Sequence, residues 1–133
     1  MQRTLYLAIL LVITPASIAN AFTLAENGQA QAVIIVDANG QASRHAADEL
    51  RSFLLQVTGA DFPMYHQLQP GVQNVLVGTV AARMLDPDFS TEGLGEDGLV
   101  IRTVGDQLIL AGGAPRWTLY AVYTFLEDHV GCH

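Results

Sequence analysis

The pattern of apolar and polar residues predicts strands and helices from residue 32 onward. Residues 32–36 are a continuous run of apolar, mostly β-branched side chains, and residues 37–40 have the composition of a turn. Such a run is typical of a strand buried on both faces. Residues 74–78 predict a second strand of this kind, and residues 62–65 predict a short edge strand limited by Pro63.

A long helix is predicted between the first strand and the edge strand. Ser43 has the side chain of an N-cap, and Gly59 supplies a stop. Apolar residues recur between them at intervals of three and four: Ala46, Ala47, Leu50, Phe53, Leu54 and Val57. This spacing places them on one side of the helix, so we expect that side to pack on the sheet.

The rest of the chain predicts a hairpin and a closing helix. A short helical turn over residues 80–85 and an acidic loop precede two extended runs, 98–103 and 107–111, which flank Gly105 and Asp106 in a hairpin. The closing helix runs from about residue 116 to residue 130. Its expected inner positions are Leu119, Val122, Tyr123 and Leu126.

This order of elements predicts the fold class. We expect an α/β sandwich, also describable as α+β, with a mixed sheet of about four to six strands packed against two main helices. One domain over residues 22–133 accounts for all of these elements, and the sequence has no internal repeat and no long linker.

Residues 1–21 have the composition of a secretory signal peptide. Arg3 precedes a nearly unbroken apolar run over residues 5–13, and Ala19 and Ala21 are small residues at the positions that a signal peptidase reads. The run is shorter than the roughly 20 residues that span a bilayer. We therefore expect cleavage near Ala21, a secreted or periplasmic product, and no membrane partner after cleavage.

Charge and cysteine content exclude two classes of protein. The six basic residues are all arginine and face 13 acidic residues, for a net charge of −7. Such a surface repels phosphate groups, so we expect no nucleic-acid partner. Cys132 is the only cysteine, which excludes an internal disulfide framework.

The acidic residues do not predict a catalytic centre. Glycoside cleavage uses two carboxyl groups about 5 to 9 Å apart on either side of the bond. The neighbouring pairs at 96–97 and 127–128 have diverging side chains, and Asp48 and Glu49 fall on the solvent side of the long helix. We expect no catalytic residue in this chain.

The sequence also predicts no metal and no cofactor. His129 and His133 have the spacing of zinc ligands on a helix, but Gly131 should end that helix and no third ligand is near. Residues 93–98 spell G-x-G-x-x-G, yet they precede a strand instead of following one, and two acids stand where a pyrophosphate would lie.

The best candidate for a binding site is the loop that opens the closing helix. Gly112 and Gly113 follow a strand, and the amide groups at the start of a helix attract anions, with Arg116 and Trp117 beside them. The alternative is structural, because glycines permit a cramped turn and Pro115 suits the first turn of a helix. We interpret Gly112 and Gly113 as a structural loop, and Arg116 and Trp117 as candidate substrate-binding residues.

Several passages resemble a known family. They are AADEL at 46–50, FL at 53–54, TG at 58–59, VLVG at 75–78, GEDGLVIR at 95–102 and GGAPRWTLYAVYTFLEDHVGC at 112–132. Together they resemble the N-terminal domain of α-glucuronidases, a group of secreted glycoside hydrolases. Related domains precede the barrels of β-N-acetylhexosaminidases.

The resemblance implies a non-catalytic accessory domain that packs against a following (β/α)-barrel, which carries the catalytic acids. It further implies a role in the breakdown of xylan side chains. Two positions depart from the family pattern: Trp117 stands where such proteins commonly have glycine, and His133 stands where an arginine and an aromatic residue usually continue the chain. We therefore expect the front part of a larger enzyme, with the barrel absent from this chain.

Two other functions stay open. The domain is a stand-alone carbohydrate-binding module if exposed rings such as Trp117, Tyr65 or Tyr120 stack on sugars. It is a truncated scaffold if it binds no polysaccharide at all. A domain separated from its barrel should expose an apolar patch.

Overall fold

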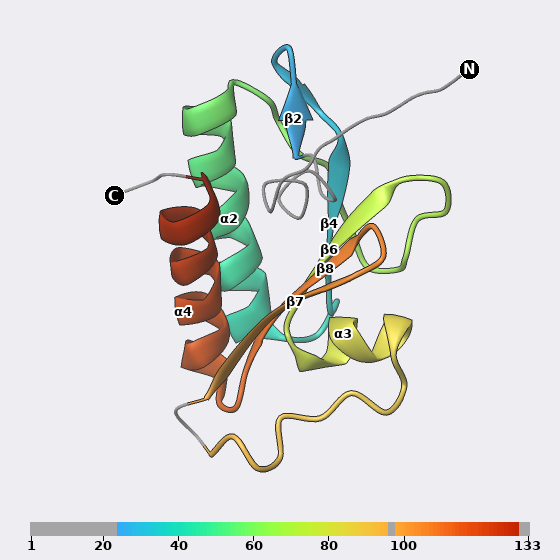
Figure 1. Ribbon diagram of the computed structural model, residues 1–133, viewed down its shortest axis with the longest axis vertical. Helices are drawn as coiled ribbons and strands as arrows, with labels where there is room; N and C mark the ends of the chain where they lie inside the picture. The colour runs from blue at the N-terminus through green and yellow to red at the C-terminus, as the bar shows by residue number, and fades with distance from the viewer. Residues whose placement is uncertain (1–23, 96–97, 131–133) are drawn as a thin grey trace, which may run out of the picture.

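The computed structural model describes residues 24–95 and 98–130 of the chain (Figure 1). The predicted signal peptide at 1–21, the acidic pair at 96–97, and Cys132 and His133 lie outside the described residues.

Within the described residues, five strands form the main sheet in the order β5-β4-β6-β8-β7. The three inner strands, β4 (Ala32–Val36), β6 (Gln73–Val77) and β8 (Gln107–Gly112), run parallel. One edge is β5 (Met64–Tyr65), parallel to β4, and the other is β7 (Leu99–Val104), antiparallel to β8. The predicted mixed sheet, its edge strand and its hairpin are thus confirmed.

Helices cover both faces of this sheet. α2 (Gln41–Thr58) and α4 (Pro115–Phe125) lie side by side on one face, and the π-helix η2 (Leu126–Val130) continues α4 (Figure 1). The short α3 (Thr79–Leu85) packs on the other face. A separate hairpin of two very short strands, β2 (Ala25–Glu26) and β3 (Gln29–Ala30), was not predicted.

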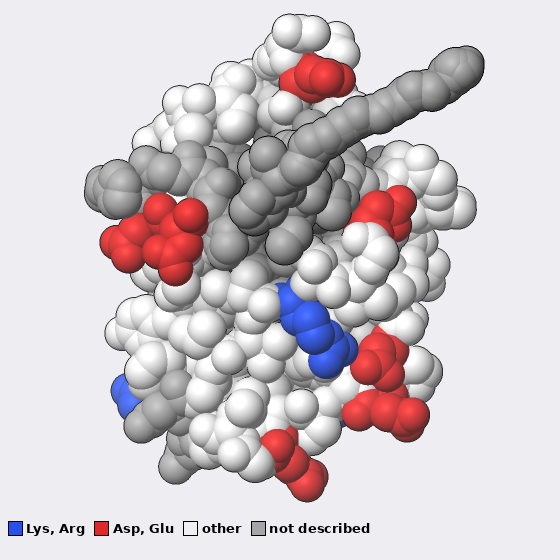
Figure 2. Space-filling view, viewed as in Figure 1, with Lys and Arg blue, Asp and Glu red and all other residues white. Residues whose placement is uncertain are grey.

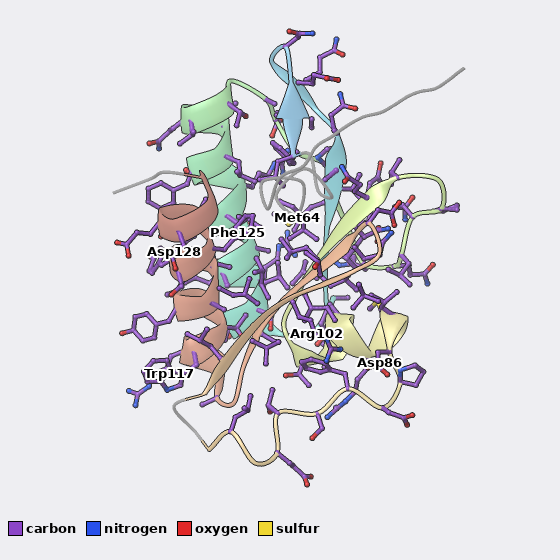
Figure 3. The ribbon with its side chains drawn as sticks, viewed as in Figure 1. Met64, Asp86, Arg102, Trp117, Phe125 and Asp128 are labelled. Atoms are coloured by element: carbon purple, nitrogen blue, oxygen red, sulfur yellow. The ribbon has the colours of Figure 1, made fainter. Side chains whose placement is uncertain are left out.

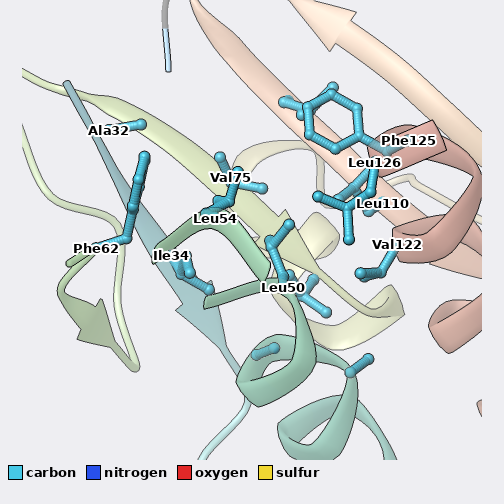
Figure 4. Close-up of a cluster of buried hydrophobic side chains, with 14 of the residues drawn as sticks. Ala32, Ile34, Leu50, Leu54, Phe62, Val75, Leu110, Val122, Phe125 and Leu126 are labelled. Carbon is cyan, nitrogen blue, oxygen red and sulfur yellow. The ribbon is translucent and has the colours of Figure 1, made fainter. Parts of the chain in front are cut away.

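The two faces of the inner strands build two separate hydrophobic cores. Side chains alternate between the faces of a strand, so Ile34 and Leu110 contact the α2 and α4 side with residues such as Leu50 (Figure 4). Ile35 and Ile109 belong to the core on the α3 side. Because both faces are covered, these strands have no polar side, and the sequence shows continuous apolar runs.

The buried side-chain amide of Asn74 fixes the start of β6 through hydrogen bonds. The side chain of Asn74, 3% exposed, donates to the carbonyls of Gln69 and Val72 and, at 2.7 Å, to Oε1 of Gln107. Its own Oδ1 accepts the amide of Gln69 at 3.0 Å. This network joins β6 to the loop before it and to the start of β8, and it satisfies the polar atoms of a residue inside the sheet.

Three details of the helix predictions were wrong. α2 begins after Gly40, so Ser43 lies inside the helix and is not its cap, although the predicted stop at Gly59 is confirmed. Val57 is 48% exposed because it belongs to the last turn of α2, which extends past η2 in Figure 1. Tyr123 is 36% exposed because it lies about 100° around the helix from the buried Val122.

Gly78 is required where α2 approaches the end of β6. Its φ of 97° and ψ of 163° belong to a region that almost only glycine adopts. A β-carbon there would also overlap with Oγ of Ser43. Gly78 therefore lets the first turn of α2 lie close to the end of β6.

We expect Gly78→Ala to lower the free energy of unfolding by at least about 2 kcal/mol, since backbone strain and steric overlap add. Gly71→Ala is the matched control: its φ is 77°, and no described atom lies within 4 Å of the added carbon. Left-handed backbone alone costs roughly 1–2 kcal/mol. Urea denaturation followed by circular dichroism measures the free energy of unfolding of both variants. Equal losses would show that overlap with Ser43 adds nothing to the backbone strain.

Candidate functional site

The loop between β8 and α4 is tightly packed at Gly112. A β-carbon on Gly112 would overlap with the backbone of Trp117 and Thr118. Its amide donates to Oγ1 of the buried Thr118 at 3.2 Å, and the amide of Gly113 donates to the carbonyl of Gly98 at 2.8 Å. These contacts give Gly112 a packing role in the strand-to-helix turn, and the backbone of Gly113 joins this turn to the start of the hairpin.

Arg116 and Trp117 come together on the first turn of α4. The guanidinium carbon of Arg116 lies 6.0 Å from the centre of the Trp117 ring, within the range of a cation–π contact. Trp117 is half-buried, and Arg116 is exposed. Figure 3 shows Trp117 at the start of α4, pointing away from the sheet.

Arg116 differs from the other described arginines in its partners. Arg44, Arg51 and Arg102 form ion pairs with Asp48, Asp61 and Asp86, and Arg83 donates to the carbonyl of Phe89. Within residues 24–95 and 98–130, Arg116 has neither kind of partner.

Trp117 is one of several aromatic side chains that lie close together on α4 and α2. Its centre lies 4.8 Å from that of Tyr120, with the planes tilted by 56°. Its Nε1 is buried and has no hydrogen-bond partner among the described residues. On the neighbouring turns, Tyr123 meets Phe53 of α2 edge to face, at 6.3 Å. Trp117 and Tyr120 were predicted as rings that could stack on sugars, whereas Phe53 and Tyr123 were predicted only as inner helix positions. The contact between these two rings joins α2 and α4 and was not predicted.

The described acids of α2 and η2 lie on helix surfaces. Glu49 accepts a hydrogen bond from the hydroxyl of Tyr123 at 2.8 Å, and Asp48 pairs with Arg44 on the helix surface. Glu127 and Asp128 are exposed on η2, and Figure 2 shows acidic side chains in separate patches. In the described part of the chain, no three His, Cys, Asp or Glu side chains gather to hold a metal ion.

A shallow groove of about 650 Å³ opens at the amino ends of β4 and β6. Asp61 and Asp106 line it, together with Gln73 and the turn between β2 and β3. A hydrogen bond from Arg51, at 2.8 Å, lowers the pKa of Asp61. Asp61 is thus held as a carboxylate, whereas a general acid needs a raised pKa. Arg116 and Trp117 lie on α4 and do not line this groove.

Among the described residues, no helix has both the length and the apolar character that a membrane crossing requires.

Comparisons with known proteins identify the fold and a family. The family model described as the N-terminus of glycosyl hydrolase family 67 matches residues 16–125. Among solved structures, 27 chains match. One of them, described as the structure of CpGH84D, has a TM-score of 0.59 and 15% identity, over 84% of this chain and 19% of that chain. At this identity the likeness concerns the fold alone, and the present chain spans about a fifth of that protein. A comparison with curated proteins gives no match.

We expect Thr118→Val to lower the free energy of unfolding by removing the hydrogen bond to the Gly112 amide. Valine has the shape of threonine but no acceptor, so the buried amide of Gly112 would lose its partner, at a cost of about 1–3 kcal/mol. Hydrogen exchange at the Gly112 amide should become faster. Thr118→Ser keeps the hydroxyl and should retain the slow exchange; equal exchange in both variants would argue against this hydrogen bond.

We also expect a raised pKa for Tyr123. Its hydroxyl donates to the Glu49 carboxylate, and ionisation would place two negative charges side by side, so the pKa lies above its ordinary value. The contact therefore stabilises the fold below the unfolded pKa and is lost as the pH rises through the folded one. Glu49→Gln should lower the pKa of Tyr123 in a ¹³C-tyrosine NMR titration, with Tyr123→Phe assigning the signal. An unchanged pKa would rule out this coupling.

Proposed function

The chain belongs to the family of N-terminal domains of glycosyl hydrolase family 67, and we propose that it serves an α-glucuronidase acting on xylan side chains. In this role it is an accessory domain without catalytic residues of its own. The observation that carries the proposal is the family match over residues 16–125, which includes every described strand and helix except η2.

The chemistry of the described residues supports a non-catalytic role. Glycoside hydrolysis needs one carboxyl group that gives a proton and a second that acts across the bond. Asp61 in the groove is held ionised by Arg51, and Glu49 is engaged by Tyr123. Asp61 is therefore not prepared to donate a proton at neutral pH.

The partner in this proposal is a catalytic (β/α)-barrel in the same longer protein. The family is defined as an N-terminus, and the fold occupies only 19% of the CpGH84D chain. The composition of residues 1–21 supports export, with cleavage near Ala21 and release to the periplasm or the medium.

A second candidate is carbohydrate binding at Arg116 and Trp117. The observation in its favour is the exposed Arg116 next to an indole ring, without a carboxylate partner among residues 24–95 and 98–130. An arginine in this setting can pair with the carboxylate of a uronic acid.

A reconstitution experiment tests the accessory role. Residues 22–133 alone should not cleave aldouronic acids. Added to a family 67 glycosyl hydrolase produced without its own N-terminal domain, they should raise the thermal midpoint of that catalytic part, because a ligand of the native state stabilises it by about 2.7 kcal/mol at 100 times its Kd. Turnover by the isolated domain that is lost on mutation of its own residues would contradict the proposal.

Isothermal titration with glucuronoxylan oligosaccharides distinguishes the second candidate. The accessory role predicts no saturable heat with the folded domain. Saturable binding that is lost in both Arg116→Ala and Trp117→Ala would instead make the domain a binding module. Asp128→Ala, which changes an exposed side chain on η2, is the control for nonspecific effects of charge.

A further inference from the structure

α4 has the composition of a buried helix although one of its sides is exposed. Arg116 is the only charged residue among its eleven. Its inner side is buried through Thr118, Ala121, Val122 and Phe125. On the outer side, Tyr120 is 44% and Tyr123 36% exposed. A helix that is apolar all round normally has partners on all sides.

α2, its neighbour in the same layer, shows the ordinary pattern for a solvent-facing helix up to its last turn, where Leu55 and Val57 are exposed. Its outer positions carry Arg44 and Asp48, which pair at 3.8 Å, followed by Ser52 and Gln56. The two helices share the same sheet face, so position in the fold does not explain the difference. The outer side of α4 differs because of its sequence.

Four rings lie on α4 and the neighbouring side of α2, and we call them the aromatic face: Phe53, Trp117, Tyr120 and Tyr123. Tyr120 and Tyr123 are exposed, and Phe53 and Trp117 are half-buried. Trp117 contacts Tyr120, Tyr123 contacts Phe53, and the Tyr123 hydroxyl is fixed by Glu49. Figure 2 shows uncharged surface along α4 between an acidic patch and an arginine. Tyrosine, tryptophan and arginine dominate the binding energy of protein interfaces, and rings held in place lose little entropy on binding.

The geometry points to the remainder of the glycosyl hydrolase as the partner that covers this face, an inference that rests on the proposed function. α4 continues directly into η2, so a segment that follows η2 in a longer protein starts at the end of this same helix. Such a tether gives the following domain a high effective concentration beside the aromatic face. Arg116 and Glu127, exposed at opposite ends of this outer side, provide charges that can fix its orientation.

The chain contains one tryptophan, which gives a direct probe of the aromatic face. Trp117 is replaced by 5-fluorotryptophan through biosynthetic labelling, so that the ¹⁹F spectrum contains one signal. The catalytic part of a family 67 glycosyl hydrolase, unlabelled and without its N-terminal domain, is then added. We expect this signal to shift on binding, and sedimentation velocity to give the Kd.

Tyr120→Glu should raise the Kd by at least about thirtyfold, as expected for a central interface residue. Tyr65→Glu is the matched control, because Tyr65 is also a tyrosine, is 41% exposed and lies on β5 at the sheet edge. It should leave the Kd unchanged. Tyr120→Ala provides a milder substitution without a new charge, and circular dichroism verifies that each variant is folded.

Three other results of these binding experiments would contradict the interface, the accessory role or both. A complex that Tyr120→Glu and Tyr120→Ala do not weaken would remove the aromatic face as the interface and leave the accessory role intact. Absence of a complex with the unsubstituted domain would contradict the accessory role and this interface together. A saturable shift of the ¹⁹F signal by xylo-oligosaccharides alone would assign the face to carbohydrate.

Discussion

The fold depends on burying three parallel strands on both faces. β4, β6 and β8 contribute side chains to two cores, and a fully buried Val, Leu or Ile side chain contributes roughly 1.5–3 kcal/mol. This burial requires helices on both sides, which α2 and α4 provide on one face and α3 on the other. Each of these helices starts where an inner strand ends. Gly112 lies against the backbone of α4, and Gly78 lies against the side chain of Ser43 on α2.

The inner strands were predictable because their signal is local. Residues 32–36 and 74–78 read as buried strands without knowledge of any partner, and Gly105 with Asp106 marks the hairpin. The exposure of Val57 and Tyr123 was not predictable. For Val57 it depends on how far α2 extends beyond η2, and for Tyr123 it depends on the rotation of α4 about its axis. β2 and β3 have two residues each, too few to show a period.

The candidate site was predictable only in part. The cramped turn at Gly112 follows from two glycines between a strand and a helix, and Arg116 and Trp117 are neighbours in the chain. The contact of Phe53 with Tyr123 joins two helices and has no counterpart in any local pattern. A usable signal was nevertheless present: a helix with one charge among eleven residues needs more than one apolar surface against which to pack.

The amide network at Asn74 has a consequence for how this acidic domain tolerates its surroundings. Asn74 and Gln107 hold the starts of β6 and β8 together through side chains that carry no charge at any ordinary pH. Acidification would neutralise the surface carboxylates and weaken pairs such as that of Arg51 with Asp61. The alignment of the inner strands would outlast those losses, so acid would loosen the periphery of the domain before its centre.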